Sequence, residues 1–169
     1  MEALAEFHAK TGNTEYAVIL YNHVLALLHN KRTGDTFLPE DLCRAATVLN
    51  NVAGVLMRGA PTPETLDTAE DFARRALEVL GDAAKNKKSI SPEDLQTCAH
   101  TFAVTLFNIG SLREMHNDRD TARAFYQASL KRSKELDLPE GISEAKQALR
   151  RLDRESTPPP STDITKPST

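Results

Sequence analysis

The 169-residue chain has no tryptophan, only two cysteines and no large excess of either charge. Its 21 basic and 24 acidic residues give a formal net charge of -3, and the two signs are mixed along the chain. Nucleic-acid-binding domains usually show a basic excess or a basic stripe, and neither is present. We therefore expect no nucleic-acid partner.

The two cysteines, Cys43 and Cys98, both lie within apolar helical patterns. A small disulfide-stabilised scaffold has more cysteines at closer spacing, and neither cysteine belongs to a metal-ligand motif. We therefore predict two reduced thiols packed in the core, no structural metal, and an intracellular, reducing compartment.

Long hydrophobic runs are also missing. No apolar stretch approaches the roughly 20 residues needed to span a bilayer, so we expect no direct membrane contact from this segment. No signal peptide is evident. Met1 enters a helical pattern with no capping residue before it. We therefore expect a domain excised from a longer protein, with an uncapped N-terminal end available for self-association.

The residues that are present predict an all-α fold. Apolar residues recur at intervals of three and four, which places them on one face of each helix. Pro39, Pro92 and Pro139 mark helix starts, because proline loses no hydrogen bond at a first helical position. Ser91 is a suitable N-cap for the second of these. The predicted helices cover 1–10, 14–31, 39–58, 64–86, 92–116, 119–137 and 139–155.

These helices form three pairs followed by a single C-terminal helix, which we interpret as a cap that closes the stack. Its arginines leave a second interpretation open, a basic partner-binding helix. Residues 156–169 are mostly Ser, Thr and Pro and have almost nothing to bury, which predicts a disordered tail. The folded domain is therefore expected to span 1–155.

Two stretches of the chain are similar to each other. Residues 49–55 and 106–112 share the order Leu, any residue, Asn, branched aliphatic, small, small, aliphatic. A ladder of alanines and aromatics follows each of them and also occurs near the N-terminus. A single helix pair cannot bury its apolar face alone, so repeated pairs predict a solenoid in which each pair stacks on the next.

The spacing of small and aromatic residues resembles the tetratricopeptide repeat. In that family a small residue in the first helix is followed by an alanine twelve positions later, then by an aromatic and another alanine. The matching residues are Gly110, Ala122, Tyr126 and Ser129 in the third pair, and Ala5, Ala17, Tyr21 and Val24 in the first. The resemblance implies an α-α superhelix of three helix pairs plus the capping helix.

The second pair departs from this pattern. Ala53 and Ala69 are sixteen positions apart, and Ala73 stands in place of the aromatic. The extra residues include Pro61 and Pro63, which predicts a longer turn between the two helices. The tryptophan typical of the family is absent throughout.

Residues 47–53 look like the kinesin-light-chain branch of the family. A second likeness, carried by 106–110 and 136–141, is to fungal mitochondrial inner-membrane repeat proteins that serve as adaptors for an i-AAA protease. The first likeness implies a protein-binding adaptor or scaffold. The second implies a mitochondrial location.

The family's first helices line a concave groove that receives an extended peptide or a partner helix. Asn51 and Asn108 occupy the same repeat position, and each precedes a core residue, so helix geometry turns them toward the groove. An Asn side chain both donates and accepts, so it can pair with a peptide backbone without selecting its sequence. The other residues predicted to line the groove are Thr47, Asn50, Gly54, Arg58, Val104, Phe107, Ser111 and Met115.

Two alternatives bear on this site. The asparagines could instead make local hydrogen bonds or face water. A clamp for the carboxylate tail of a chaperone requires basic and amide side chains in the first repeat, where this chain has Glu2, Ala3 and Glu6. We therefore do not expect a chaperone-tail clamp.

Catalytic motifs are missing. The five histidines lack metal-ligand spacing, and the chain has neither a glycine-rich phosphate loop nor a Gly-x-Ser-x-Gly sequence. We therefore expect no enzymatic activity and no cofactor. The first hypothesis is a protein-interaction module that acts through its groove. The alternative is a structural assembly or oligomerisation domain of a larger protein, such as a protease adaptor.

Overall fold

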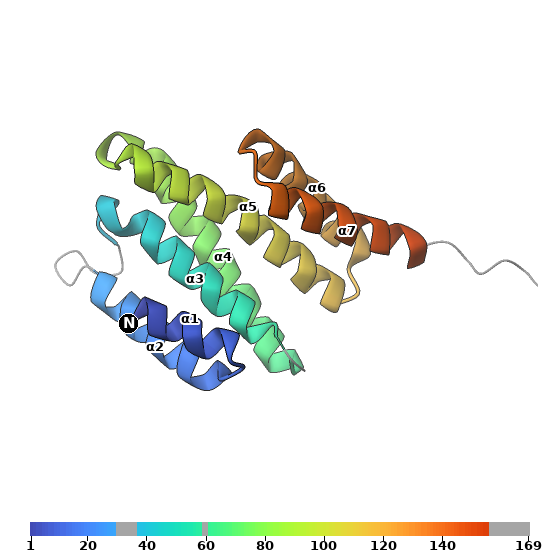
Figure 1. The fold of residues 1–169 in the computed structure, drawn as a ribbon, viewed down its shortest axis with the longest axis horizontal. Helices are drawn as coiled ribbons and strands as arrows, with labels where there is room; N and C mark the ends of the chain where they lie inside the picture. Colours follow the sequence, from blue (N-terminus) through green and yellow to red (C-terminus); the bar gives the residue numbers. More distant parts are fainter. Residues whose placement is uncertain (30–36, 59–60, 156–169) are drawn as a thin grey trace, which may run out of the picture.

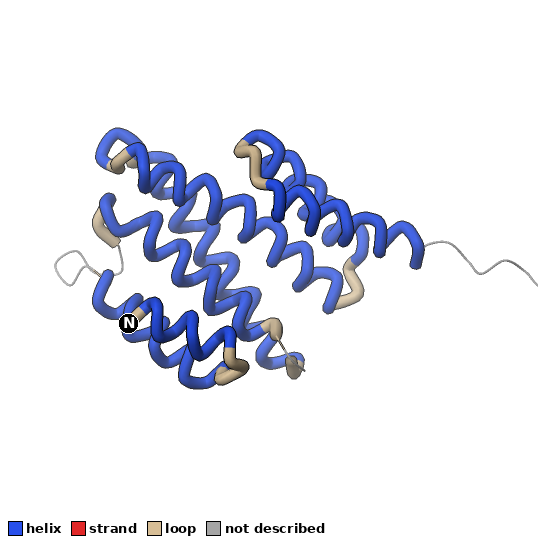
Figure 2. Tube along the Cα trace, viewed as in Figure 1, coloured by secondary structure: helices blue, strands red, loops and turns tan. Residues whose placement is uncertain are grey.

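The computed structural model describes residues 1–29, 37–58 and 61–155, and its regular elements within these ranges are all helical (Figures 1 and 2). The prediction of an all-α fold is therefore confirmed. The α-helices are α1 (Glu2–Lys10), α2 (Thr14–Leu28), α3 (Leu42–Leu56), α4 (Pro63–Lys85), α5 (Pro92–Met115), α6 (Arg119–Glu135) and α7 (Pro139–Glu155). The tail expected at 156–169 lies outside the described residues.

Helix boundaries follow the local signals in the sequence. The Ser91 hydroxyl accepts a hydrogen bond from the backbone N–H of Asp94 at 3.0 Å, which confirms the predicted N-cap of α5. Pro39 opens a short 3-10 turn, η1 (Pro39–Asp41), so α3 itself begins three residues later than expected. A second 3-10 turn, η2 (Lys87–Ser89), joins α4 to α5. The second helix ends at Leu28, because His29 is extended.

The helices pack in successive pairs across the molecule. Within the pairs, α1 packs on α2, α3 on α4 and α5 on α6, and contacts between pairs join α2 to α3, α4 to α5 and α6 to α7. In Figure 1, α1, α3, α5 and α7 lie in front of α2, α4 and α6. Because α3 packs directly on α5, the first helices of the second and third pairs adjoin, and α1 and α7 lie on the same side of the molecule (Figure 1).

Small residues allow the helices of a pair to approach closely. In the third pair, a Cβ atom added to Gly110 would lie 2.8 Å from two ring carbons of Tyr126 and 3.3 Å from the backbone oxygen of Ala122. In the first pair, Ala5 and Ala17 are both completely buried. Residues of the spacing that resembles the tetratricopeptide repeat therefore lie where the helices of these pairs are tightly packed.

The apolar core is shared between pairs. One cluster joins Tyr21 and Val24 of the first pair to Val48 and Val52 of the second. Another joins Ala53 and its neighbours on α3 and α4 to residues on α5. Each pair therefore completes its core against the next pair, as expected for stacked repeats.

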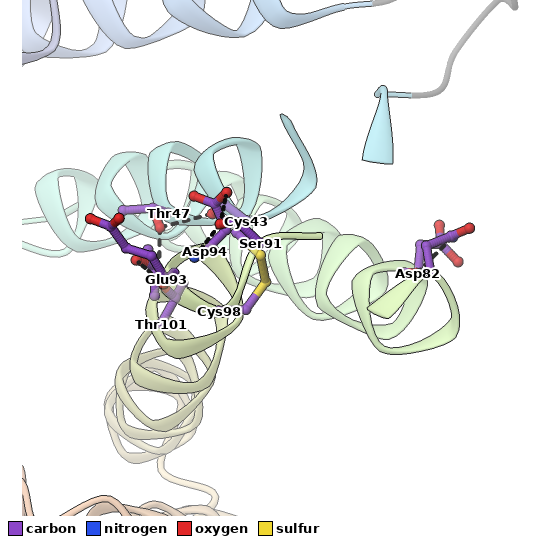
Figure 3. Close-up of a disulfide and its surroundings, with 10 residues drawn as sticks. Cys43, Thr47, Asp82, Ser91, Glu93, Asp94, Cys98 and Thr101 are labelled. Atoms are coloured by element: carbon purple, nitrogen blue, oxygen red, sulfur yellow. Dashed lines mark hydrogen bonds between the residues drawn. A yellow bond between two sulfur atoms is a disulfide. The ribbon is translucent and has the colours of Figure 1, made fainter. Parts of the chain in front are cut away.

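The two cysteines form a disulfide, so the prediction of reduced thiols is wrong. The bond joins Cys43 on α3 to Cys98 on α5, with Cα atoms 4.8 Å apart (Figure 3). One turn further along, the hydroxyls of Thr47 and Thr101 lie 2.8 Å apart across the same interface. The two cysteines are 55 positions apart in the sequence, and stacking brings them together. The expectation of a reducing compartment was based on free thiols, and the disulfide removes that reason for it.

Candidate functional site

A groove with a volume of about 590 Å³ crosses the layer formed by α1, α3, α5 and α7. Of the ten residues predicted to line a binding groove, nine line this one: Asn50, Asn51, Gly54, Arg58, Val104, Phe107, Asn108, Ser111 and Met115. The structure therefore brings together side chains that the sequence holds in two stretches more than forty positions apart.

Thr47 is the predicted residue that does not line the groove. Its hydroxyl donates to the backbone oxygen of Cys43 at 2.9 Å and lies 2.8 Å from that of Thr101. It therefore belongs to the packed interface between α3 and α5, beside the disulfide. Helix periodicity identified its face of α3 but not how closely α5 approaches that face.

Two asparagines form the centre of the groove. The Asn108 amide nitrogen donates to the side-chain oxygen of Asn50 at 3.0 Å, which links α5 to α3. Asn50 is only 5% exposed, so its side chain is held within the packed interface. Among the described residues, the amide oxygen of Asn108 has no hydrogen-bond partner. This leaves Asn108 oriented and able to accept a hydrogen bond from a ligand.

Asn51 lies beside Tyr21, which reaches the groove from α2. Burial and the nearby negative charge of Glu6 raise the pKa of Tyr21, while a hydrogen bond with Asn51 partly offsets this rise. The phenol therefore stays neutral at ordinary pH and adds a hydroxyl to the polar centre. The sequence pattern matches Tyr21 to the aromatic position of the first repeat and predicts no groove role for it. The signal that could have placed it here is its hydroxyl, since a buried tyrosine usually pairs that group.

Apolar side chains form one part of the groove wall. On α5, Val104 is 37% exposed and Met115 is 44% exposed. Phe107 lies between them in the sequence, and its ring is 5.2 Å from that of Tyr126, centre to centre. These side chains offer a surface for apolar groups of a ligand, next to the amides that suit its backbone.

Charged residues at the margins of the groove were not predicted. Glu6 and Lys10 come from α1, and Glu144 comes from α7. Arg58 follows α3, and its guanidinium donates to the backbone oxygen of Ala9 on α1 at 3.2 Å. The repeat pattern places α1, with Glu6, at a first-helix position, but it predicts no groove residue on α1. Glu144 lies outside the prediction because α7 is interpreted as a cap, whereas in the structure it takes a first-helix position.

A polar network lies beside the groove. The Tyr126 hydroxyl is 2.6 Å from Glu114 and 3.1 Å from Ser111, and Arg151 of α7 donates twice to Glu114 at 2.7 Å. The hydrogen bond from Arg151 lowers the pKa of Glu114 despite partial burial. Burial, followed by the hydrogen bond to Glu114, raises the pKa of Tyr126 to about 12. This network fixes α7 against α5 at the Ser111 margin of the groove.

The described ranges contain no group of three or more His, Cys, Asp or Glu residues arranged to hold a metal ion. Within the same ranges, no helix combines the length and apolarity required to cross a membrane.

Comparisons with protein-family models, curated proteins and solved structures find no match to this chain. The resemblance to the tetratricopeptide repeat therefore depends on the residues of the chain itself and on their arrangement.

Proposed function

We propose that the chain is a tetratricopeptide-type interaction module that binds an extended peptide or a partner helix in the groove across α1, α3, α5 and α7. The observation that carries the proposal is the convergence of nine sequence-predicted residues on that groove. The module is proposed to act as an adaptor or scaffold without chemistry of its own.

The composition of the groove suits a peptide. Asn51 and Asn108 supply amides for backbone groups, and Phe107 and Met115 supply apolar contacts. Gly54 has no side chain, and the nearest atom to a Cβ built there is the Asn108 amide nitrogen at 3.8 Å. A ligand backbone can therefore approach α3 closely at this point.

The size of the groove sets the length of the ligand. Four helices at the packed spacing of about 8–10 Å would span roughly 25 Å, so the groove can hold an extended segment of at least about eight residues. This estimate favours a short linear segment over a folded domain as the group that enters the groove.

The proposal can be tested with a displayed library of random peptides of about this length. Peptides selected by the protein are then measured against the double variant Asn51→Ala/Asn108→Ala. Loss of two hydrogen bonds of about 1 kcal/mol each is expected to weaken binding roughly 30-fold.

The matched control is Gln96→Ala/Gln127→Ala, which removes two side-chain amides from exposed positions on α5 and α6 outside the groove. This variant is expected to bind like the parent chain. Equal affinity of the parent and of a folded Asn51→Ala/Asn108→Ala variant would refute the proposed role of the groove.

The likeness to i-AAA protease adaptors extends the proposal to a location in mitochondria and to a client or subunit of such a protease as the bound protein. This part depends on residues 106–110 and 136–141 alone. Fractionation of cells that carry the tagged full-length protein tests it. A signal outside mitochondria would contradict the location and leave the peptide-binding role standing.

A further inference from the structure

Large apolar side chains are exposed on the outer side of the first helix pair. Six residues form this surface, here called the N-terminal edge: Met1, Leu4, Phe7, Tyr16, Ile19 and Leu27. Each of them is between 50% and 71% exposed. The largest apolar patch on a typical monomer covers roughly 300–600 Å² and is often functional, so the edge is a candidate for an interface.

The exposed residues follow from the helical pattern of α2. Tyr21, Val24 and Leu28 are buried and pack into the core, while Tyr16, Ile19 and Leu27, spaced three and eight residues apart, share another face. A surface helix normally carries charged side chains on its outer face. The fifteen residues of α2 include a single charged side chain, Glu15.

The stripes on α1 and α2 join into one surface. The His8 ring stacks on that of Tyr16 with centres 5.6 Å apart, and the Phe7 ring contacts His8 edge-on at the same distance. Aromatic side chains therefore bridge the two helices. Through Phe7, His8 and Tyr16, the apolar stripes of α1 and α2 are therefore connected.

The opposite end of the stack has a different character. Ala145, Ala148 and Leu152 are buried, whereas the exposed side chains of α7 between 143 and 154 are all polar or charged. Lys146 and Arg150 are among them. An apolar edge therefore meets no complementary surface at the C-terminal end of another copy, which disfavours head-to-tail stacking. The same edge of a second copy is complementary to it.

We propose that two copies of this chain associate through their N-terminal edges in a two-fold symmetric dimer. Six large side chains at this exposure present on the order of 600 Å² per copy, against about 800 Å² per partner in a standard stable interface. The flanking His8 and His23, on α1 and α2, extend the contact toward that size. Two-fold pairing buries the edge of each copy against the edge of the other, so it gives a closed dimer and no open filament.

The dimer goes beyond peptide binding and does not depend on it. Glu6, Ala9 and Lys10 of α1 line the groove, whereas Leu4 and Phe7 belong to the edge. Both copies therefore keep an open groove after association. A dimer with two grooves binds a partner that carries two linked segments more tightly than a single copy does.

The test measures the mass of the purified chain by light scattering over roughly a hundredfold range of concentration. The expected result is a concentration-dependent rise to twice the 18.6 kDa of one chain. The double variant Phe7→Glu/Leu27→Glu is expected to keep the mass of one chain throughout. Both positions are exposed, so circular dichroism should show unchanged helicity.

The control variant Phe102→Glu introduces one glutamate at an exposed apolar position on α5. It is expected to dimerise like the parent chain. Wild-type chain that stays monomeric over the whole range would overturn the proposal. So would a dimer that persists in the Phe7→Glu/Leu27→Glu variant, because that dimer would use another surface.

Cross-linking tests the symmetry of the dimer. The native cysteines are joined to each other, so a single introduced cysteine supplies the free thiol. Tyr16→Cys and Ile19→Cys are tested separately, and at least one is expected to cross-link to the same residue of a second copy. Gln147→Cys on α7 is expected to stay uncross-linked. Cross-linking through Gln147→Cys alone would contradict edge-to-edge pairing.

Discussion

The side-chain amide of Asn108 donates a hydrogen bond to the side-chain oxygen of Asn50, although the two residues are 58 positions apart. Asn50 is buried, and Asn108 is partly exposed in the groove. The bond therefore connects the packing of α3 on α5 to the orientation of a predicted ligand-binding group. The Asn108 side chain is therefore already oriented in the groove in the absence of a ligand.

Asn50→Ala is expected to lower the free energy of unfolding by about 1–3 kcal/mol, because the Asn108 amide loses its buried acceptor. A double-mutant cycle with Asn108→Ala, followed by urea unfolding, isolates the pair. We expect a coupling free energy of about 1 kcal/mol. Strictly additive effects would show that the hydrogen bond contributes nothing to stability.

Gly110→Ala is expected to reduce the free energy of unfolding by about 1–3 kcal/mol, because the new methyl group overlaps the buried Tyr126 ring. Gly81 on α4 is the matched control, since a Cβ there meets nothing within 4 Å. Gly81→Ala should stabilise the protein by up to about 1 kcal/mol through its higher helix propensity. A Gly110→Ala variant as stable as the parent would contradict the close approach of α5 and α6.

Tyr126 is expected to make the protein less stable at high pH. Its pKa rises from an ordinary 10.0 to about 12 in the folded protein, so folding favours the neutral phenol. The neutral Tyr126 phenol contributes about 2–3 kcal/mol to the free energy of unfolding. This stabilisation is fully present below about pH 10 and is lost as the pH rises toward about 12. The pKa of Tyr21 is also raised, so its ionisation at high pH destabilises the folded protein in the same way.

Urea unfolding between pH 9 and pH 12 measures this loss, at roughly one-unit intervals. The variant Tyr126→Phe lacks the ionisable group and is expected to show a smaller decline over the same range. A decline as steep as that of the parent chain would assign the pH dependence to other groups.

Reduction of the Cys43–Cys98 bond is expected to lower the free energy of unfolding. The bond closes a loop with a sequence separation of 55, and loop-closure entropy predicts a contribution of about 4 kcal/mol for that length. Thermal unfolding with and without dithiothreitol measures the effect. The variant Cys43→Ala/Cys98→Ala should not respond to the reductant. A parent chain that is equally stable with both thiols free would contradict the expected contribution.

Local signals in the sequence were sufficient to predict the helices. Prolines and caps such as Ser91 act within a few residues, so the predicted helices agree with the structure to within about three residues at each described end. The groove was also largely predictable, because Asn51 and Asn108 occupy equivalent repeat positions and stacked repeats bring equivalent faces together.

Other features depend on how the pairs stack and could not be read from single helices. The disulfide requires Cys43 and Cys98 to meet across α3 and α5, whereas periodicity showed only that each is buried. Thr47 faces α5 for the same reason. Glu144 enters the groove because α7 takes the place of another first helix, which the interpretation of α7 as a cap did not anticipate.

Nuclear magnetic resonance of the labelled chain, titrated with a peptide selected from the random library, tests binding in the groove most directly. The side-chain amide signals of Asn51 and Asn108 and the backbone signal of Gly54 are expected to shift together as the peptide binds. Signals of Gln96 and Gln127 should stay in place. Shifts confined to the outer faces of α4 and α6, with the groove asparagines unchanged, would show that the peptide does not bind in the groove.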